Sequence, residues 1–173
     1  WLPNHAEFLK ITWAAQRSGI YYTPISTYFQ AKEVAYILEN SDAKLLISNQ
    51  TLAAQLPAET RASLNLLLID AEIESDQSWQ GRCAKLPATP LVDETEGAEM
   101  IYSSGTTGQP KGVRFPLSKA AYGTVSKLFH TRIDMHQISA ETRYLSTAPM
   151  YHSAPLRYNM IVTRMGGSAF IME

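Results

Sequence analysis

The repeated alternation of amphipathic segments with short, continuously apolar segments constrains the fold of this chain more than any other feature. Two of the apolar segments, residues 44–48 and 64–69, read KLLIS and LNLLLI and show no regular exchange of polar with apolar side chains. Strands of this kind are buried on both faces, as in a parallel sheet that is covered by helices. Along residues 4–69 the predicted order is helix, strand, helix, strand, helix, strand. We therefore predict an α/β fold in which helices pack on layered parallel sheets.

Local signals place the elements of the N-terminal half. Residues 4–17 are predicted to form a helix, because Asn4 followed by Glu7 resembles a capping box and Gly19 lies where a C-terminal glycine is expected. Residues 30–40 carry apolar side chains at helical spacing and are predicted to form the second long helix. Shorter elements are predicted as a strand at residues 20–25 and a helical turn at residues 52–56.

The same alternation returns in the C-terminal half. Ser118 is predicted to cap a helix that continues to about residue 130, and a strand is predicted at residues 143–147. A helix at residues 155–165 and a strand at residues 168–172 follow, with two glycines between them. A second α/β part is therefore expected here.

A polar stretch separates the two halves. Residues 70–97 are acidic and contain two prolines, and we interpret them as a surface connector with short structure near Trp79. The predicted organisation is a first α/β part at residues 1–69, the connector, and a second α/β part at residues 98–173 that includes the glycine-rich loop. All three parts are assigned to one domain.

The charge balance and the cysteine count exclude several function classes. Fifteen basic and sixteen acidic residues give a formal charge of −1, which provides no electrostatic footprint for nucleic acid or an anionic membrane. The single cysteine, Cys83, excludes an internal disulfide and fits a reducing, cytoplasmic compartment. The four histidines lack the spacing of a metal site, and no apolar run reaches the length of a membrane span. We therefore expect no metal site built by this sequence, no nucleic-acid partner and no membrane span.

Residues 101–113, which read IYSSGTTGQPKGV, carry the strongest chemical pattern. Hydroxyl side chains, glycines that let backbone N–H groups approach a ligand, and a lysine are groups that bind phosphate oxygens. Apolar and β-prone residues flank the loop, so it is predicted to connect two strands. The pattern lacks the adjacent Gly-Lys-Ser/Thr of a Walker loop and the G-x-G-x-x-G of a dinucleotide site. A solvated turn is the alternative interpretation of so many turn-forming residues.

The string SSGTTGQPKG between two strands resembles the signature loop of the adenylate-forming superfamily, which contains acyl-CoA synthetases, luciferases and the adenylation domains of peptide synthetases. NHAEFLKITWAAQRSGIYYTPIS and EVAYILENSDAKLLI resemble early segments of the N-terminal domain of these enzymes. PMYHSAPL resembles a later motif that lines their acyl and ATP sites. The resemblance covers nearly the whole chain and implies a partial N-terminal domain of an acyl-CoA-synthetase-like fold.

For function, the resemblance implies a two-step ligase. A carboxylic acid attacks the α-phosphate of ATP, bound with Mg²⁺, to give an acyl-adenylate and pyrophosphate, and the thiol of coenzyme A then displaces AMP. The loop would hold the β- and γ-phosphates, since donors arranged in advance stabilise the charge that develops on the leaving pyrophosphate. The residues implied to bind ATP in this way are Ser103, Ser104, Gly105, Thr106, Thr107, Gly108 and Lys111.

His152, in the turn PMYHSAP, is the candidate catalytic residue that the same resemblance implies. It would line the region of the carboxylate and the α-phosphate, where a neutral ring donates one hydrogen bond. A histidine in such a turn is also compatible with a structural role, and Met150 and Tyr151 fit packing as well as a pocket. With the apolar residues Ala154, Leu156 and Met160 beyond the histidine, this segment resembles that of a ligase for a fatty or other hydrophobic acid more than that of an amino-acid adenylation domain.

The sequence begins at Trp1 rather than Met and stops at the predicted end of a strand, so we expect a piece of a larger protein. The metal-binding glutamate, the ribose-binding aspartate and the C-terminal lysine of the family have no match here. This polypeptide alone is therefore expected to be inactive in adenylation. An amino-acid adenylation domain, a luciferase-like enzyme and a non-catalytic nucleotide-binding module stay open as alternatives.

Overall fold

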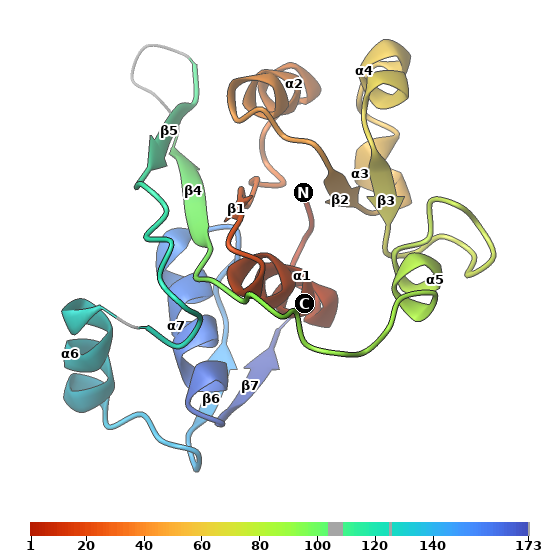
Figure 1. The fold of residues 1–173 in the computed structure, drawn as a ribbon. Coiled ribbons are helices and arrows are strands. Elements are labelled where there is room, and N and C mark those ends of the chain that lie inside the picture. The colour runs from red at the N-terminus through yellow and green to blue at the C-terminus, as the bar shows by residue number, and fades with distance from the viewer. Residues whose placement is uncertain (104–108, 125, 173) are drawn as a thin grey trace. The chain divides into compact units, whose positions relative to one another are not determined.

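The computed structural model describes residues 1–103, 109–124 and 126–172 (Figure 1). The predicted phosphate-binding residues Ser104, Gly105, Thr106, Thr107 and Gly108 lie outside the described residues. The chain forms two compact units, the first made of residues 1–2, 23–90 and 100–114, and the second made of residues 3–22, 91–99 and 115–173. Each unit is described by itself.

The first unit is built around a parallel pair of short strands. Its elements up to residue 90 are α2 (Ala31–Asn40), β2 (Leu46–Ser48), α3 (Gln50–Ala53), α4 (Ala58–Ser63), β3 (Leu66–Leu68) and α5 (Trp79–Ala84). Leu46 lies opposite Leu66, and all three residues of β3 are buried. The parallel arrangement that the apolar runs predict is confirmed. Helix α2 contributes Val34 and Ile37 to the core, both with no exposed surface.

The described part of the second unit contains another parallel pair of strands and three helices. Its elements are α1 (Ala6–Arg17), β1 (Tyr21–Tyr22), α6 (Lys127–His136), β6 (Arg143–Ser146), α7 (Ser153–Arg164) and β7 (Ser168–Ile171). Strand β6 pairs in parallel with β7, and α7 is the helix that connects them. Ile161 and Val162 of α7 pack with Ile138 in a buried cluster. The predicted return of helix–strand alternation is confirmed.

Strand β4 (Ala98–Ser103) is divided between the two units: residues 98–99 belong to the second unit and residues 100–103 to the first. Its first two residues pair in parallel with β1, and its last four pair antiparallel with β5 (Lys111–Arg114). The prediction that strands flank the glycine-rich loop is therefore confirmed. Within the described residues no helix has the length and apolar character needed to cross a membrane.

The first helix begins two residues later than the sequence predicts. His5, and not Asn4, occupies the N-cap position, and its Nδ1 accepts a hydrogen bond from the backbone N–H of Glu7 at 3.1 Å. The predicted capping role of Asn4 is wrong, because the Asn4 side chain bonds to distant backbone groups instead. The predicted C-terminal glycine is confirmed, since Gly19 adopts a φ of +65°.

The start at Ser118 and the end near residue 130 that the sequence predicts for the next helix are also wrong. The helix starts at Lys127, and Ser126 caps it by accepting a hydrogen bond from the N–H of Phe129. The preceding backbone is paired with another segment: the N–H of Glu96 donates to Ala120, and the N–H of Tyr122 donates to Glu94, each at 3.0 Å. The carbonyl of Ala120 and the N–H of Tyr122 are therefore not available for hydrogen bonds within a helix. Gly123, with a φ of +97°, then turns the chain out of helical geometry.

Other differences are small. The strand predicted at residues 20–25 is limited to Tyr21–Tyr22, and the helical turn predicted at residues 52–56 lies at Gln50–Ala53. Short structure near Trp79 is confirmed as α5. Helix α4 was not predicted, because its sequence AETRAS has no apolar side chain larger than alanine and none of its residues is buried.

Candidate functional site

The hairpin of β4 and β5 brings together the two predicted phosphate-binding residues that the structure describes. Ser103 lies directly opposite Lys111 in the antiparallel register, and both residues are exposed. Residues directly opposite in such a pair have Cβ atoms about 5 Å apart and point to the same face. A hydroxyl and an ammonium group therefore stand side by side where the loop leaves the hairpin. That pairing can bind a phosphate oxygen from two donors.

The next pair along the hairpin anchors it within the first unit. Tyr102 is buried, and its hydroxyl donates a hydrogen bond to Oδ1 of Asn40 at 2.5 Å. Burial raises the pKa of Tyr102, so the phenol stays a neutral donor. Opposite it, Gly112 leaves room for the ring, because a Cβ there would lie 2.8 Å from Cζ of Tyr102. The hairpin is thus fixed by a side chain on the face opposite to Ser103 and Lys111.

His152 lies in the second unit, at the N-cap of α7. Its side chain is exposed, and its ring meets the ring of Tyr151 edge-on, with centroids 4.8 Å apart. Met150 and Tyr151 are buried, with 0% and 5% of their surfaces exposed, so both contribute to packing. An exposed imidazole that directly follows two buried residues can contact a ligand without disturbing the core.

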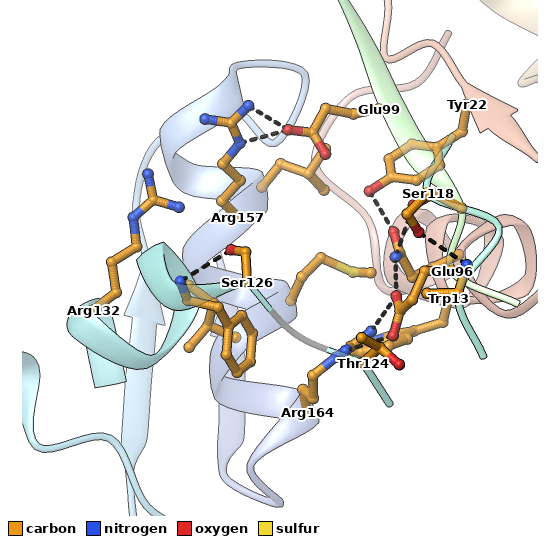
Figure 2. Close-up of a pocket in the computed structure, with 17 residues that line it drawn as sticks. Trp13, Tyr22, Glu96, Glu99, Ser118, Thr124, Ser126, Arg132, Arg157 and Arg164 are labelled. Atoms are coloured by element: carbon orange, nitrogen blue, oxygen red, sulfur yellow. Dashed lines mark hydrogen bonds and ion pairs between the residues drawn. The ribbon is translucent and has the colours of Figure 1, made fainter. Parts of the chain in front are cut away.

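The second unit contains a cavity of about 430 Å³ (Figure 2). Helices α1, α6 and α7, strand β1 and residues 96–99 contribute its walls. Its apolar surface comes from Trp13, Phe129, Leu156, Met160 and Ile161. Its charged groups are Glu96, Glu99, Arg132, Arg157 and Arg164. The cavity therefore has the volume of a small-molecule site and a charge surplus of one guanidinium.

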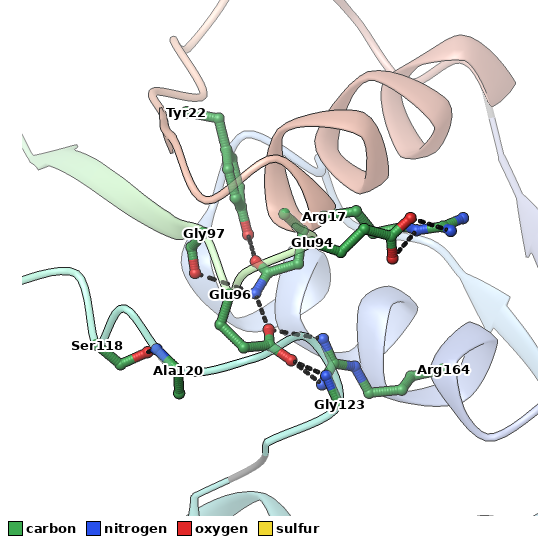
Figure 3. A network of polar contacts seen from close by, with 10 residues as sticks. Arg17, Tyr22, Glu94, Glu96, Gly97, Ser118, Ala120, Gly123 and Arg164 are labelled. Atoms are coloured by element: carbon green, nitrogen blue, oxygen red, sulfur yellow. Dashed lines mark hydrogen bonds and ion pairs between the residues drawn. The ribbon is translucent and has the colours of Figure 1, made fainter. Parts of the chain in front are cut away.

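An ion pair between Glu96 and Arg164 forms one wall of this cavity (Figure 3). The two terminal guanidinium nitrogens of Arg164, Nη1 and Nη2, donate to the two carboxylate oxygens of Glu96 at 2.8 and 2.9 Å. Nε2 of Gln16 and the backbone N–H of Gly123 are further donors to this carboxylate. Burial raises the pKa of Glu96, but these hydrogen bonds outweigh burial and hold the pKa below its ordinary value. Both oxygens of the Glu96 carboxylate accept two hydrogen bonds from protein groups, so this side chain has a structural role.

Arg164 also stacks on three aromatic rings. Its guanidinium carbon lies 5.4 Å from the ring centroid of Trp13, 5.0 Å from that of Tyr122 and 5.5 Å from that of Phe129. These cation–π contacts stabilise the guanidinium, and their attraction is stronger where water is excluded. Arg164 therefore connects α7 to α1, to α6 and to the segment before α6.

Of the other charged side chains that line the cavity, two form an ion pair with each other and the third, Arg132, lies outside the ion pairs of the described residues. Arg157 forms an ion pair with Glu99. Arg132 on α6 has no ion pair with any residue in the described ranges. A carboxylate or phosphate that entered the cavity would meet this guanidinium beside apolar walls.

Sequence reasoning missed this cavity. Glu94, Glu96 and Gly97 lie in the stretch interpreted as a connector, although they hold α1, α7 and β4 in place. One signal was available: Arg157 and Arg164 are seven positions apart, which is two helical turns, so both lie on one face of α7. Across residues 1–103, 109–124 and 126–172, no group of three or more His, Cys, Asp or Glu side chains could hold a metal ion.

Comparison with known proteins gives the class to which this architecture and this loop correspond. A model of the family of AMP-binding enzymes matches residues 1–173, and the chain therefore belongs to that family. Among curated proteins it is 25% identical over 176 residues to an indoleacetate–CoA ligase from Aromatoleum aromaticum, covering 98% of this chain and 34% of the relative. It is 36% identical over 103 residues to tyrocidine synthase 3 from Brevibacillus parabrevis, covering 58% of this chain and 1% of the relative.

The fold is shared with solved structures of the same class. O-succinylbenzoate coenzyme A synthetase from Bacillus subtilis, in complex with ATP and magnesium ion, superposes with a TM-score of 0.66 at 19% identity. The match covers 100% of this chain and 42% of that protein. The predicted α/β fold of the N-terminal domain of an adenylate-forming enzyme is confirmed. The chain spans about a third of the length of the indoleacetate–CoA ligase that it matches.

Proposed function

We propose that the complete protein carrying this chain is an ATP-dependent, AMP-forming acid–CoA ligase. The observation that carries the proposal is the pairing of Ser103 with Lys111 at the base of the loop, in a chain that matches the AMP-binding family over its full length. The relative that is named an indoleacetate–CoA ligase supports coenzyme A as the acceptor of the acyl group.

In this proposal the loop binds the β- and γ-phosphates of ATP. Lys111 supplies the mobile cation and Ser103 a hydroxyl donor from the described strands, and residues 104–108 supply the further hydroxyls and backbone groups of the motif. These groups stabilise negative charge on the leaving pyrophosphate. Magnesium enters as part of the MgATP substrate, as it is present in the B. subtilis synthetase structure. His152 donates a hydrogen bond near the carboxylate and the α-phosphate.

The acid is proposed to be hydrophobic, such as a fatty or aryl-substituted acid. The cavity of the second unit supports this choice, because Trp13, Phe129 and Met160 offer apolar walls and Arg132 offers a partner for a carboxylate. A part in fatty-acid or other lipid metabolism follows only if the acid is aliphatic. A cytoplasmic location, expected from the single cysteine Cys83, stays a prediction.

Replacing Arg132 with alanine is expected to raise KM for the acid roughly 10-fold or more, since a hydrogen-bonded pair between charged groups contributes about 1.5–3 kcal/mol. The kcat value and KM for ATP should change little. Steady-state kinetics with the complete protein measure all three constants. Arg143→Ala is the matched control, because Arg143 is exposed on β6 and lies over Phe170. Equal KM values for wild type and Arg132→Ala would show that the carboxylate binds elsewhere.

Amino-acid adenylation is the second candidate, and the identity of 36% with tyrocidine synthase 3 favours it. The two candidates differ in substrate and in acyl acceptor. The complete protein should therefore be assayed for AMP formation with ATP, coenzyme A and a panel of fatty, aryl and amino acids. Turnover that requires coenzyme A and a hydrophobic acid supports the proposed ligase. Pyrophosphate exchange with an amino acid alone supports the second candidate, and ATP binding without turnover of any acid contradicts both.

A further inference from the structure

The side chain of Asn4 makes three long-range hydrogen bonds at one edge of the second unit. Its Oδ1 accepts from the backbone N–H of Met150 at 2.8 Å. Its Nδ2 donates to the carbonyl of Met172 at 2.9 Å and to the carbonyl of Ala148 at 3.2 Å. All the hydrogen-bonding groups that an asparagine side chain can offer are in use except one lone pair.

The three partners lie where the parallel strands β6 and β7 end. Ala148 and Met150 belong to the turn that follows β6, and Met172 directly follows β7. Carboxyl ends of parallel strands meet at the same edge of a sheet, and ligands of α/β proteins bind at that edge. Asn4 therefore ties the two strand ends to each other and to the start of α1.

The same turn determines the position from which the side chain of His152 projects. Pro149 accepts a hydrogen bond from the N–H of His152 at 3.1 Å, and the carbonyl of His152 accepts from the N–H of Leu156 at 3.2 Å as α7 begins. Met150 is fully buried, so the turn is held on one side by packing and on the other by Asn4. A shift of Ala148 or Met150 would move the His152 ring with it.

We propose that Asn4 is a positioning residue for the acid-activation site, acting on His152 through the turn at residues 148–152. The proposal rests on the proposed ligase function for its kinetic consequence, and on the three hydrogen bonds for its geometry. Asn4 does not touch the reacting atoms in this account. It sets the position of the imidazole at the end of β6.

Asn4→Ala is expected to lower kcat of the complete protein roughly 10- to 100-fold, because small displacements of a catalytic group have large effects on rate. KM for coenzyme A should stay unchanged. In the background of His152→Ala, Asn4→Ala should lower kcat by less than about twofold, since two residues that act through one step are non-additive. Equal losses in both backgrounds would overturn the proposal, as they would indicate general destabilisation.

A second readout does not depend on turnover. The ring resonances of His152 should shift in the NMR spectrum of Asn4→Ala, whereas those of His130 should stay in place. Unmoved His152 resonances would overturn the positioning role even if the ligase function is correct. Shifted resonances in a protein that adenylates no acid would support the role and contradict the proposed function.

Variants of similar shape keep the test decisive. Asn4→Asp preserves the volume and the acceptor for Met150 but replaces the donor to Ala148 and Met172, so it serves if Asn4→Ala does not fold. The same kinetic and NMR changes are expected from it. Asn65→Ala is the matched control, because Asn65 is exposed in the first unit and its change should leave His152 unaffected.

Discussion

Replacing Lys111 with alanine in the complete protein is expected to lower kcat for acyl-adenylate formation by roughly 10²–10³-fold, the usual effect of removing one donor from a developing oxyanion. Lys111 begins β5 opposite Ser103, and its side chain lies on the exposed face of the hairpin. The neighbouring pair keeps Tyr102 on the other face, so loss of the lysine side chain removes charge without loosening the anchor to Asn40.

ATP–pyrophosphate exchange with a saturating acid measures this effect. KM for the acid should change less than kcat, because the lysine acts on the leaving pyrophosphate. Lys85→Ala is the matched control, since Lys85 is an exposed lysine of the same unit. Unchanged exchange and unchanged ATP affinity in Lys111→Ala would show that the loop does not contact phosphate. In that case the alternative of a solvated turn would be correct.

Replacing Arg164 with alanine is expected to destabilise the chain by about 3 kcal/mol at neutral pH, since removal of one partner leaves the other charge buried and uncompensated. The side chain of Glu96 is only 9% exposed, so water replaces the lost guanidinium poorly. The three aromatic contacts of Arg164 disappear with it. Urea unfolding followed by tryptophan fluorescence measures the loss, with Arg143→Ala as an exposed arginine control.

The pH dependence of this loss has a defined sign. In the wild type the folded-state pKa of Glu96 is lowered, so its contribution is present above the ordinary carboxyl pKa and is lost as the pH falls through the folded-state value. In Arg164→Ala burial acts with fewer opposing donors, which favours protonation of the carboxyl. The difference in unfolding free energy between variant and wild type should therefore shrink on acidification. A difference that is constant from pH 7 to pH 4 would contradict the ion-pair explanation.

The sequence was sufficient for elements whose signals are local. The apolar runs that became β2 and β3, Gly19 at the end of α1, and the strands on both sides of the loop depend on neighbours in sequence. The misplaced helix start at Ser118 shows the limit of such signals. Residues 120–122 have helix-compatible side chains, but their backbone groups are used by Glu94 and Glu96, which a local pattern does not reveal.

The residues of the candidate site likewise fall into those that a local motif predicts and those that it does not. Ser103, Lys111 and His152 could be predicted as site residues because the residues of a motif are contiguous in sequence. The groups that hold the site, such as Asn40 under Tyr102, are 62 positions from their partners and carry no motif. Asn4 was assigned a local role for the same reason: a capping asparagine and a long-range bridging asparagine look alike until the partner is known.

The distance along the chain between Asn4 and its partners also predicts an order of folding events. Strands β6 and β7 are joined by residues 147–167 alone, whereas the bonds of Asn4 span 144 to 168 positions. Contacts that close short loops form early, and those that close long loops bear a larger entropic cost and form late. We therefore expect the turn that carries His152 to form before Asn4 docks, which makes docking of the N-terminal segment a late step of folding.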